Sequence, residues 1–393
     1  MIDLDNLVNK TVDALAPSGI RKFFDIVAEM DDAISLGVGE PDFMTPWTIR
    51  EAGIYSLEKG QTYYTANAGL MELREAVCDY TNRKYNIKYS PKSEVLITVG
   101  GSEAIDAMIR CVVNPGDEVL IVEPSFVCYK PLTLMAGGIP VIIETKEEDS
   151  FRLLPEQLKE KITDKTKLLI LPFPNNPTGG IMSRADLEAI AEVLRGTDIL
   201  VLSDEIYGEL KYGDEKHVPF SAIDGMRERT VVVNGFSKAF AMTGWRLGYA
   251  IGPSRLIKLM TKVHQFGIMS APTTAQYAAI EAMTNCDDEV ESMRQEYNYR
   301  RRFIVDGFRA MGLSCFEPLG AFYVFPCIKS LGMSSQEFCE KLLMEEKVAV
   351  VPGTAFGSCG EGFVRCSYAY SIKNIEEALK RIDRFVKNHR KGN

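Results

Sequence analysis

The sequence predicts an α/β protein whose core is a doubly wound, mostly parallel β-sheet. Short apolar runs of strand length recur along the chain, for example at 94–99, 139–144 and 166–172, and turn or helix signals follow each of them. This alternation of strands and helices is typical of parallel sheets, because a helix usually supplies the crossover between parallel neighbours. Ligands of such sheets bind at the carboxyl ends of the strands. We therefore expect the site residues just after strands.

Composition and charge narrow the classes of function. The 393 residues suffice for two to three domains, and 46% hydrophobic with 25% charged residues is typical of a soluble globular protein. The net charge of −9, without a basic stripe, predicts neither nucleic acid nor a membrane as partner. An acidic N-terminus and nine cysteines without a CxxC pair favour a cytoplasmic protein with reduced thiols. Three histidines leave few candidates for a zinc site or a Ser-His-Asp triad.

The most informative stretch is VVVNGFSKAFAMTGWRLGYAIG, residues 231–252. Its three valines predict a buried strand, and Ser237, Lys238 and Arg246 follow that strand. An amine can form a Schiff base with an aldehyde, while a hydroxyl and a guanidinium can hold a phosphate. Alternatively, these three side chains could simply be solvated on the surface. The apolar residues around them argue against a surface position: Phe236, Phe240, Met242 and Trp245.

A second strand, within 198–210, ends at Asp204. An unpaired carboxylate at the end of an apolar strand is costly, so Asp204 needs a cationic partner unless it is only a helix N-cap. Ahead of both strands, directly after the apolar run at 166–172, lies FPNNPTGG at 173–180, which is too rich in proline and glycine for strand or helix and predicts a rigid loop. Two more glycine-containing segments, ISLGVGEPDF and VGGSEAIDAMI, predict a close backbone approach to a ligand and a phosphate site at a helix N-terminus.

The stretch SKAFAMTGWRLGY resembles the cofactor-lysine signature of fold type I pyridoxal-phosphate (PLP) enzymes, in the form used by class I and II aminotransferases. Other segments match that family in the same order: LGVGEPDF, YTANAGLMELR, the GGS turn, NPTG, SDEIY and RCSYA. The resemblance covers nearly the whole chain. It implies that Lys238 is the Schiff-base lysine and the proton shuttle, and that PLP is the cofactor.

The resemblance also implies roles for the other candidate residues. Asp204 pairs with the protonated pyridine nitrogen, while Asn176 and Tyr207 hydrogen-bond the phenolic oxygen. Phe126 stacks on the ring, with an ordinary core position as the alternative. The phosphate is held by a larger set, namely Gly101, Ser102, Glu103, Ser237 and Arg246.

Substrate binding and assembly follow from the same resemblance. Gly39, Asn176 and Arg365 bind the substrate, with Arg365 as the clamp of its α-carboxylate; a structural salt bridge is the alternative for Arg365. Tyr64 reaches the cofactor phosphate of the neighbouring subunit, unless it serves only in packing. A homodimer with shared active sites is therefore expected.

The implied architecture has a large PLP-binding domain at 46–285, with a seven-stranded sheet, and a small α/β domain built from both termini. Residues 1–45 form an arm and part of the small domain, and 286–393 form the rest. Within the latter we expect a long helix at 287–311, strands in GAFYVFP, VAVVPGTAFG and GFVRCSYA, and helices at 335–346 and 374–389. A helix is also expected from Pro17 to Met30, and an irregular segment at 269–276.

The expected reaction is ping-pong transfer of an amino group from an L-amino acid to a 2-oxo acid. Some dicarboxylate-preferring relatives carry a basic residue where this chain has Ser102, which favours neutral or aromatic donors. Two alternatives stay open. One is a PLP-dependent C–S β-lyase, and the other is a non-catalytic PLP-binding sensor domain, for which no basic winged-helix segment precedes residue 17.

Overall fold

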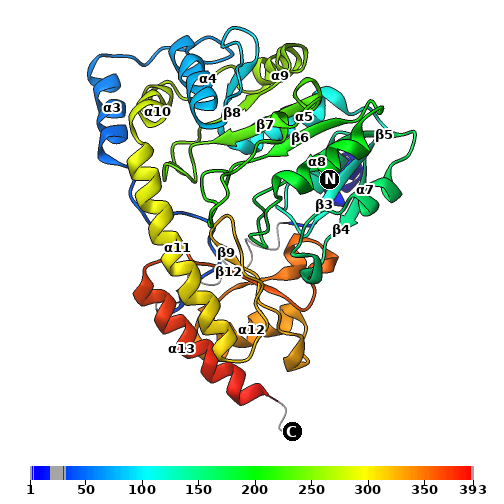
Figure 1. Ribbon diagram of the computed structural model, residues 1–393, viewed down its shortest axis with the longest axis vertical. Coiled ribbons are helices and arrows are strands. Elements are labelled where there is room, and N and C mark those ends of the chain that lie inside the picture. The colour runs from blue at the N-terminus through cyan, green and yellow to red at the C-terminus, as the bar shows by residue number, and fades with distance from the viewer. Residues whose placement is uncertain (1, 3, 18–29, 31, 391–393) are drawn as a thin grey trace.

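The computed structural model describes residues 2, 4–17, 30 and 32–390, and its centre is a seven-stranded sheet in the order β2-β8-β7-β6-β5-β3-β4 (Figure 1). Strand β8 runs antiparallel to both neighbours, and the other pairs are parallel. The predicted mostly parallel sheet is thereby confirmed. The strands are β2 (Val95–Thr98), β3 (Glu118–Glu123), β4 (Ile139–Glu144), β5 (Thr166–Leu171), β6 (Leu200–Asp204), β7 (Thr230–Gly235) and β8 (Gly248–Ile251).

Helices cover both faces of this sheet, because alternate strand residues point to opposite sides. In β2, Val95 and Ile97 pack with α4 and α10, whereas Leu96 packs with α5 and α9. All three side chains are at most 1% exposed. The helices of this part are α3 (Trp47–Glu58), α4 (Met71–Tyr85), α5 (Gly100–Val112), α6 (Tyr129–Met135), α7 (Pro155–Lys161), α8 (Arg184–Leu194), α9 (Ser254–Gly267) and α10 (Thr273–Asn285).

A smaller α/β unit lies at the other end of the molecule (Figure 1). Its three-stranded antiparallel sheet has the order β11 (Val351–Pro352), β12 (Val364–Ser367) and β9 (Tyr323–Val324). From the N-terminal part of the chain, β1 (Ile34–Ser35) pairs in parallel with β10 (Val348–Ala349), so this unit combines segments from both halves of the sequence. The expected helices at 335–346 and 374–389 are α12 (Ser335–Glu346) and α13 (Ile372–His389).

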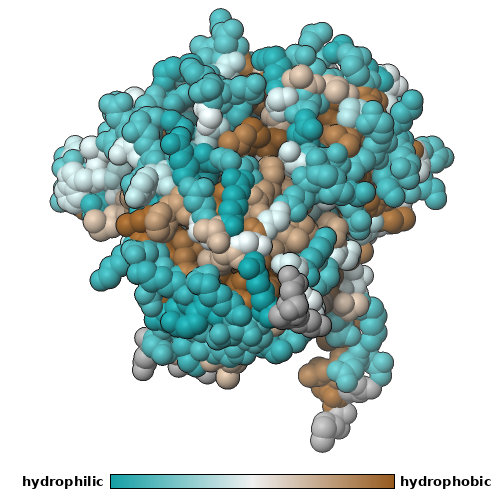
Figure 2. Space-filling view, turned by 60° about the horizontal axis from the view of Figure 1, so that its bottom comes forward, coloured by the Kyte–Doolittle hydropathy of each residue, from teal (hydrophilic) through white to brown (hydrophobic). Residues whose placement is uncertain are grey.

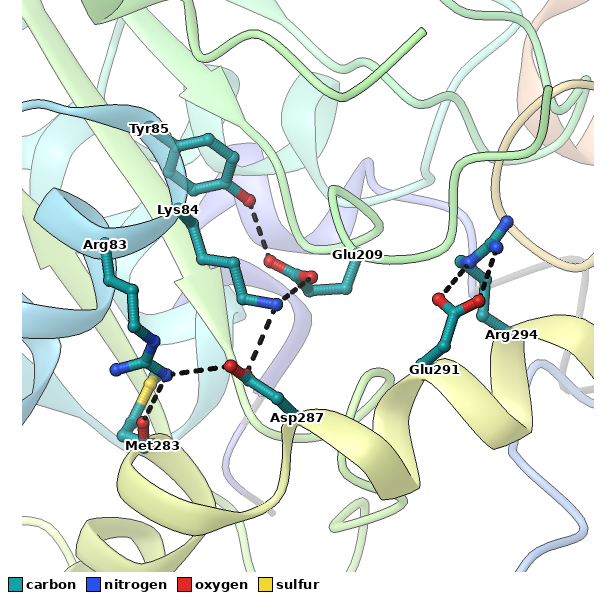
Figure 3. Close-up of polar contacts among 8 residues, drawn as sticks. All are labelled: Arg83, Lys84, Tyr85, Glu209, Met283, Asp287, Glu291 and Arg294. Atoms are coloured by element: carbon teal, nitrogen blue, oxygen red, sulfur yellow. Dashed lines mark hydrogen bonds and ion pairs between the residues drawn. The ribbon is translucent and has the colours of Figure 1, made fainter. Parts of the chain in front are cut away.

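Helix α11 (Asp287–Ala310) runs from the large unit to the small one, as expected for 287–311 (Figure 1). A network of charged side chains surrounds its first turns (Figure 3). Lys84, in the last turn of α4, contacts Asp287 at 3.2 Å and Glu209 at 3.6 Å. Arg294 on α11 donates to the carbonyl of Lys211 at 3.2 Å. The segment that follows β6 is therefore tied to both helices.

Two segments that were predicted from the sequence are the irregular stretch at 269–276 and the helix from Pro17 to Met30. The segment 269–276 was expected to be irregular, but α10 begins at Thr273, directly after Pro272. A proline at a helix start lacks only an N–H that would have no partner there, so Pro272 marks a beginning rather than a break. The helix expected from Pro17 to Met30 falls on 18–29, outside the described residues.

The described residues also show the state of the cysteines and whether a membrane-spanning helix or a metal-binding cluster is present among them. All nine cysteines are free thiols. Within the described ranges, none of the helices is both long and apolar enough to cross a membrane. The same ranges hold no cluster of three or more His, Cys, Asp or Glu side chains placed to bind a metal ion.

Candidate active site

A cavity of about 390 Å³ opens at the carboxyl ends of the parallel strands. The end of β6 and the loops after β5 and β7 bring Asp204, Asn176 and Lys238 to it, because these strands are adjacent and parallel. Of the thirteen residues predicted from the sequence, eleven line the cavity. They are Gly39, Gly101, Ser102, Phe126, Asn176, Asp204, Tyr207, Ser237, Lys238, Arg246 and Arg365.

Lys238 lies just past β7, and its Nζ donates to the carbonyl of Gly39 at 2.5 Å. Burial, helped by the positive charges of Arg365 and Arg246 and opposed by Glu40, lowers the pKa of this amine to about 8. At pH 7 roughly a tenth of such an amine is neutral, far more than for an ordinary lysine. Lys238 can therefore serve as a nucleophile or base near neutral pH.

Asp204 closes the floor of the cavity and is 6% exposed. The hydroxyl of Tyr129 donates to its Oδ2 at 2.6 Å, and the amide of Ile206 donates to Oδ1 at 3.3 Å. Burial raises the pKa of Asp204 to about 6, and these two hydrogen bonds oppose the rise. A cationic ring nitrogen beside this carboxylate would favour its ionised form.

Arg365 enters from β12 and is 2% exposed. Its Nη1 donates to Oδ1 of Asn176 at 2.9 Å and its Nη2 to the carbonyl of Gly37, but its buried Nε has no hydrogen-bond partner among the residues that the structure describes. The guanidinium lies 4.4 Å from the ring centre of Tyr323. None of the ion pairs among the described residues includes Arg365, so the structural salt bridge considered above is absent from this part of the chain. A buried cation without a counter-ion is suited to an anionic ligand.

The opposite end of the cavity is built around the N-terminus of α5. Gly100 has φ of +75°, and a Cβ there would lie 2.7 Å from Nη2 of Arg246. The guanidinium of Arg246 therefore lies directly against the first turn of the helix. Ser102 and Ser237 line the same wall. Unpaired amides at the positive end of a helix dipole, with a guanidinium and hydroxyls, suit a phosphate.

Two predicted residues lie outside this cavity. The carboxylate of Glu103 turns away, because Oε2 accepts from the amide of Val99 and Oε1 pairs with Nδ1 of His264, each at 2.5 Å. Glu103 could thus offer a phosphate only its backbone. Tyr64 is 82% exposed and does not line the cavity of its own subunit.

Sequence reasoning missed two tyrosines that line the cavity. Tyr129 binds Asp204, and the hydroxyl of Tyr323 lies 2.9 Å from that of Tyr207. Tyr129 follows Phe126 by three residues, and Tyr323 lies in the predicted strand GAFYVFP, so each looked like ordinary packing. Only the contact across the fold reveals them.

The set of donors and acceptors fits PLP. An amine of lowered pKa suits the aldehyde, a buried carboxylate suits the ring nitrogen, and the wall of α5 suits the phosphate. Asn176 and Tyr207 bring hydrogen-bonding groups to the same cavity, and Phe126 brings an aromatic ring. The free Nε of Arg365 remains for a substrate carboxylate.

Comparison with known proteins agrees with this geometry. The family described as "Aminotransferase class I and II" matches residues 31–382. A putative aminotransferase of Bacillus subtilis is 52% identical over 375 residues, covering 95% of this chain and 97% of the relative. An aspartate aminotransferase of Pyrococcus abyssi is 46% identical and covers 96% of this chain and 97% of its own.

A solved structure gives the same result for the fold. The aromatic aminotransferase of Pyrococcus horikoshii superposes with a TM-score of 0.89 at 44% identity, and the match covers 94% of this chain and 99% of that one. A family match over nearly the whole sequence, relatives of about half-identical sequence and a shared fold point the same way. The chain belongs to the class I and II aminotransferases, a family of PLP-dependent enzymes.

Proposed function

We propose that this PLP-dependent aminotransferase acts on neutral or aromatic L-amino acids, with a 2-oxo acid as the second substrate. The relatives named above are an aspartate and an aromatic aminotransferase, so family membership does not decide the donor. The supporting observation is the set of cations around the cavity. Among the described residues, the basic side chains that line it are Lys238, Arg246 and Arg365. Each has a proposed partner already, which leaves no cation for a second substrate carboxylate.

Bound PLP supplies an electron sink for the pair left when the α-proton of the amino acid is removed. We propose that Arg365 binds the α-carboxylate through its fork, using the Nε that lacks a partner. Lys238, as a neutral amine, takes the α-proton at Nζ and returns it to the cofactor side of the site. Asp204 stays ionised and holds the ring nitrogen in its protonated form. Tyr207 and Asn176 would donate hydrogen bonds to the phenolic oxygen of the cofactor.

The donor assignment is tested with a panel of L-amino acids and 2-oxoglutarate, following the absorbance of the cofactor in the first half-reaction. We expect kcat/KM for phenylalanine, tyrosine, leucine and methionine to exceed that for aspartate at least about tenfold, since one unpaired buried carboxylate costs more than 1.4 kcal/mol. Ser102→Lys, which adds a cation at the first turn of α5, should raise kcat/KM for aspartate relative to that for the neutral and aromatic donors. A wild-type preference for aspartate overturns the assignment.

The same panel separates transamination from β-elimination. Each donor should yield its own 2-oxo acid in a one-to-one ratio with the amino acid formed from the acceptor. A cysteine conjugate that yields pyruvate and a free thiol faster than any donor is transaminated would instead identify a C–S β-lyase.

We also propose that the enzyme is a cytoplasmic homodimer with shared sites, and that its large domain spans 46–285. Nine free thiols support a reducing compartment. Exposed apolar side chains support a partner surface, and Figure 2 shows such residues gathered across the middle of one face. Exposed apolar side chains on α3 and in the segment before α4 are Trp47, Ile54, Tyr55, Leu57, Tyr63 and Tyr64. Size-exclusion chromatography with light scattering should give about twice the 43.8 kDa of one chain.

A further inference from the structure

The hydrogen bond between Tyr129 and Asp204 joins two elements that are distant in the sequence. Tyr129 is the first residue of α6, and Asp204 is the last residue of β6, 75 positions later. The hydroxyl of Tyr129 donates to Oδ2 of Asp204 at 2.6 Å, a length typical of a hydrogen bond to an ionised acceptor. Both side chains are buried, at 2% and 6% exposure. Water therefore cannot replace this bond easily.

Tyr129 also contacts Phe126, another aromatic residue of the cavity. Its ring meets that of Phe126 edge-on, with 6.1 Å between the centres and 78° between the planes. The backbone beneath it is held as well, because Oγ1 of Thr133 donates to the carbonyl of Tyr129 at 2.9 Å. Tyr129 thus lies against the residue proposed for the face of the PLP ring and against the one proposed for its nitrogen.

Asp204 has few other means of staying ionised and oriented. Its second hydrogen bond, from the amide of Ile206 to Oδ1, is longer at 3.3 Å. The charged or titratable groups around it are Tyr129 and Cys128 of α6, with Glu205 and Tyr207 of the segment after β6. None of these is a cation. Burial moreover raises the pKa of Tyr129 well above its usual value, so its hydroxyl keeps its proton and always donates.

We propose that Tyr129 is a positioning residue, which acts through Asp204 to hold the nitrogen of the PLP ring protonated and through Phe126 to hold the plane of the ring. The inference rests on the proposed roles of Asp204 and Phe126. It deepens the proposed function because it places part of the control of the cofactor in α6, outside the strand-end loops.

The test compares Tyr129→Phe, which removes the hydroxyl but keeps the ring against Phe126, with wild type. In apoenzyme labelled with ¹³C at the aspartate carboxyls, the titration midpoint of Asp204, assigned from Asp204→Asn, should rise by about one pH unit. The Kd for PLP at pH 7.5 should rise about tenfold. The acidic limb of the pH profile of kcat should move upward, since protonation of Asp204 now begins at a higher pH.

Tyr297→Phe is the matched control. Tyr297 is 0% exposed and does not line the cavity, and in the described part of the chain its hydroxyl has no hydrogen-bond partner. The same chemical change there should leave the titration of Asp204, the Kd and the pH profile as in wild type. If Tyr129→Phe behaves like Tyr297→Phe in the first two measurements, the inference is overturned.

A double-mutant cycle separates an effect through Asp204 from a general disturbance of the site. In the Asp204→Asn background, Tyr129→Phe should weaken PLP binding by less than twofold; a second tenfold loss would contradict the route through Asp204. If Tyr129→Phe does not fold, 2,3-difluorotyrosine at 129 keeps the shape with a stronger donor. It should lower the midpoint of Asp204, and an unchanged midpoint overturns the inference.

These readouts do not depend on the proposed donors. A wild-type enzyme that binds PLP at Lys238 but prefers aspartate refutes the donor assignment and leaves the test of Tyr129 intact. Unchanged midpoint and Kd in Tyr129→Phe refute the inference while transamination stands.

Discussion

Three cations share one small cavity with a single buried carboxylate, and this arrangement determines how each group titrates. Lys238 faces Arg365 and Arg246 in a site of low solvent access, so its charged form is disfavoured. Asp204 is buried and has no cation beside it among the described residues, so its neutral form is favoured. The two pKa values therefore approach each other, at about 8 and about 6. Titratable groups whose pKa values are shifted in this manner are typical of active sites.

The lowered pKa of Lys238 predicts how the apoenzyme takes up PLP. Only the neutral amine reacts with the aldehyde, so the rate should rise with pH up to about 8 and then level off, whereas an ordinary lysine keeps gaining reactivity to about pH 10. Stopped-flow absorbance measures this rate. Borohydride reduction and peptide mapping should place PLP on Lys238. Lys238→Ala should still bind PLP and lose turnover by more than about a thousandfold, and PLP trapped on another lysine in wild type would refute the assignment.

Arg365→Lys replaces a fork of two directed bonds with one point charge. We expect kcat/KM to fall about a hundredfold for every amino donor alike, because all donors share the α-carboxylate. The change should leave the Kd for PLP within about twofold, since Arg365 comes from β12 and not from the phosphate wall. A loss confined to acidic donors would place Arg365 at the side-chain pocket instead.

At the scale of elements, α4, α11 and the segment after β6 meet in the network of Figure 3. Acidic residues begin α11 and basic residues end α4, so each complements the dipole of its own helix as well as the other helix. Tyr85 donates to Oε1 of Glu209 at 2.8 Å, which fixes the segment that begins at Asp204 and contains Tyr207. The network thus connects the first turns of α11 to one wall of the site.

Lys84→Met tests this network, because it removes the cation shared by Asp287 and Glu209. Glu209 has a side chain only 16% exposed, so we expect a loss of about 1 kcal/mol, or roughly 2 °C in Tm. The loss should shrink in 1 M NaCl, where screening acts over about 3 Å. Lys380→Met removes an exposed pair with Glu376 and should leave Tm within about 0.5 °C. Equal shifts in the two variants would argue against a special role of the network.

At the scale of the whole molecule, the position of Tyr64 raises the question of where its hydroxyl acts. It lies before α4 with 82% of its surface exposed, while Lys238, Asp204 and Asn176 line a cavity in the same chain. A tyrosine outside its own cavity can take part in catalysis only across a subunit interface. This is the arrangement that we propose, and a hybrid dimer tests it.

Lys238→Ala and Tyr64→Ala chains, each weak as a homodimer, should complement each other when mixed through unfolding and refolding. In a hybrid, one site takes its lysine from the second chain and its tyrosine from the first, and that site is intact. Random pairing makes half of the dimers hybrids with one good site each, so activity should approach about a quarter of wild type. Differently tagged chains verify that hybrids form. If the mixture then never exceeds the mean of its parents, the shared site is refuted.

The order of strands and helices followed from the sequence, because burial on both sheet faces demands apolar runs and the crossovers demand amphipathic helices between them. The polar residues that follow strand ends, Asp204 and Lys238, were visible for the same reason. The start of α10 at Thr273 was missed, because the segment 269–276 was expected to be irregular although a helix can begin directly after a proline. The boundaries of the two domains stay a prediction.

The tertiary structure alone decided which side chains meet, because a contact between distant segments leaves no local pattern. Tyr129 and Asp204 lie 75 positions apart in the sequence. The separation is 116 positions for Tyr207 and Tyr323, and it is 189 positions for Asn176 and Arg365. Each pair looks like packing or an isolated polar residue in the sequence. The sequence determined which functional groups stand at the strand ends. The packing of α6, β9 and β12 around those ends determined how these groups are oriented and how strongly their pKa values are shifted.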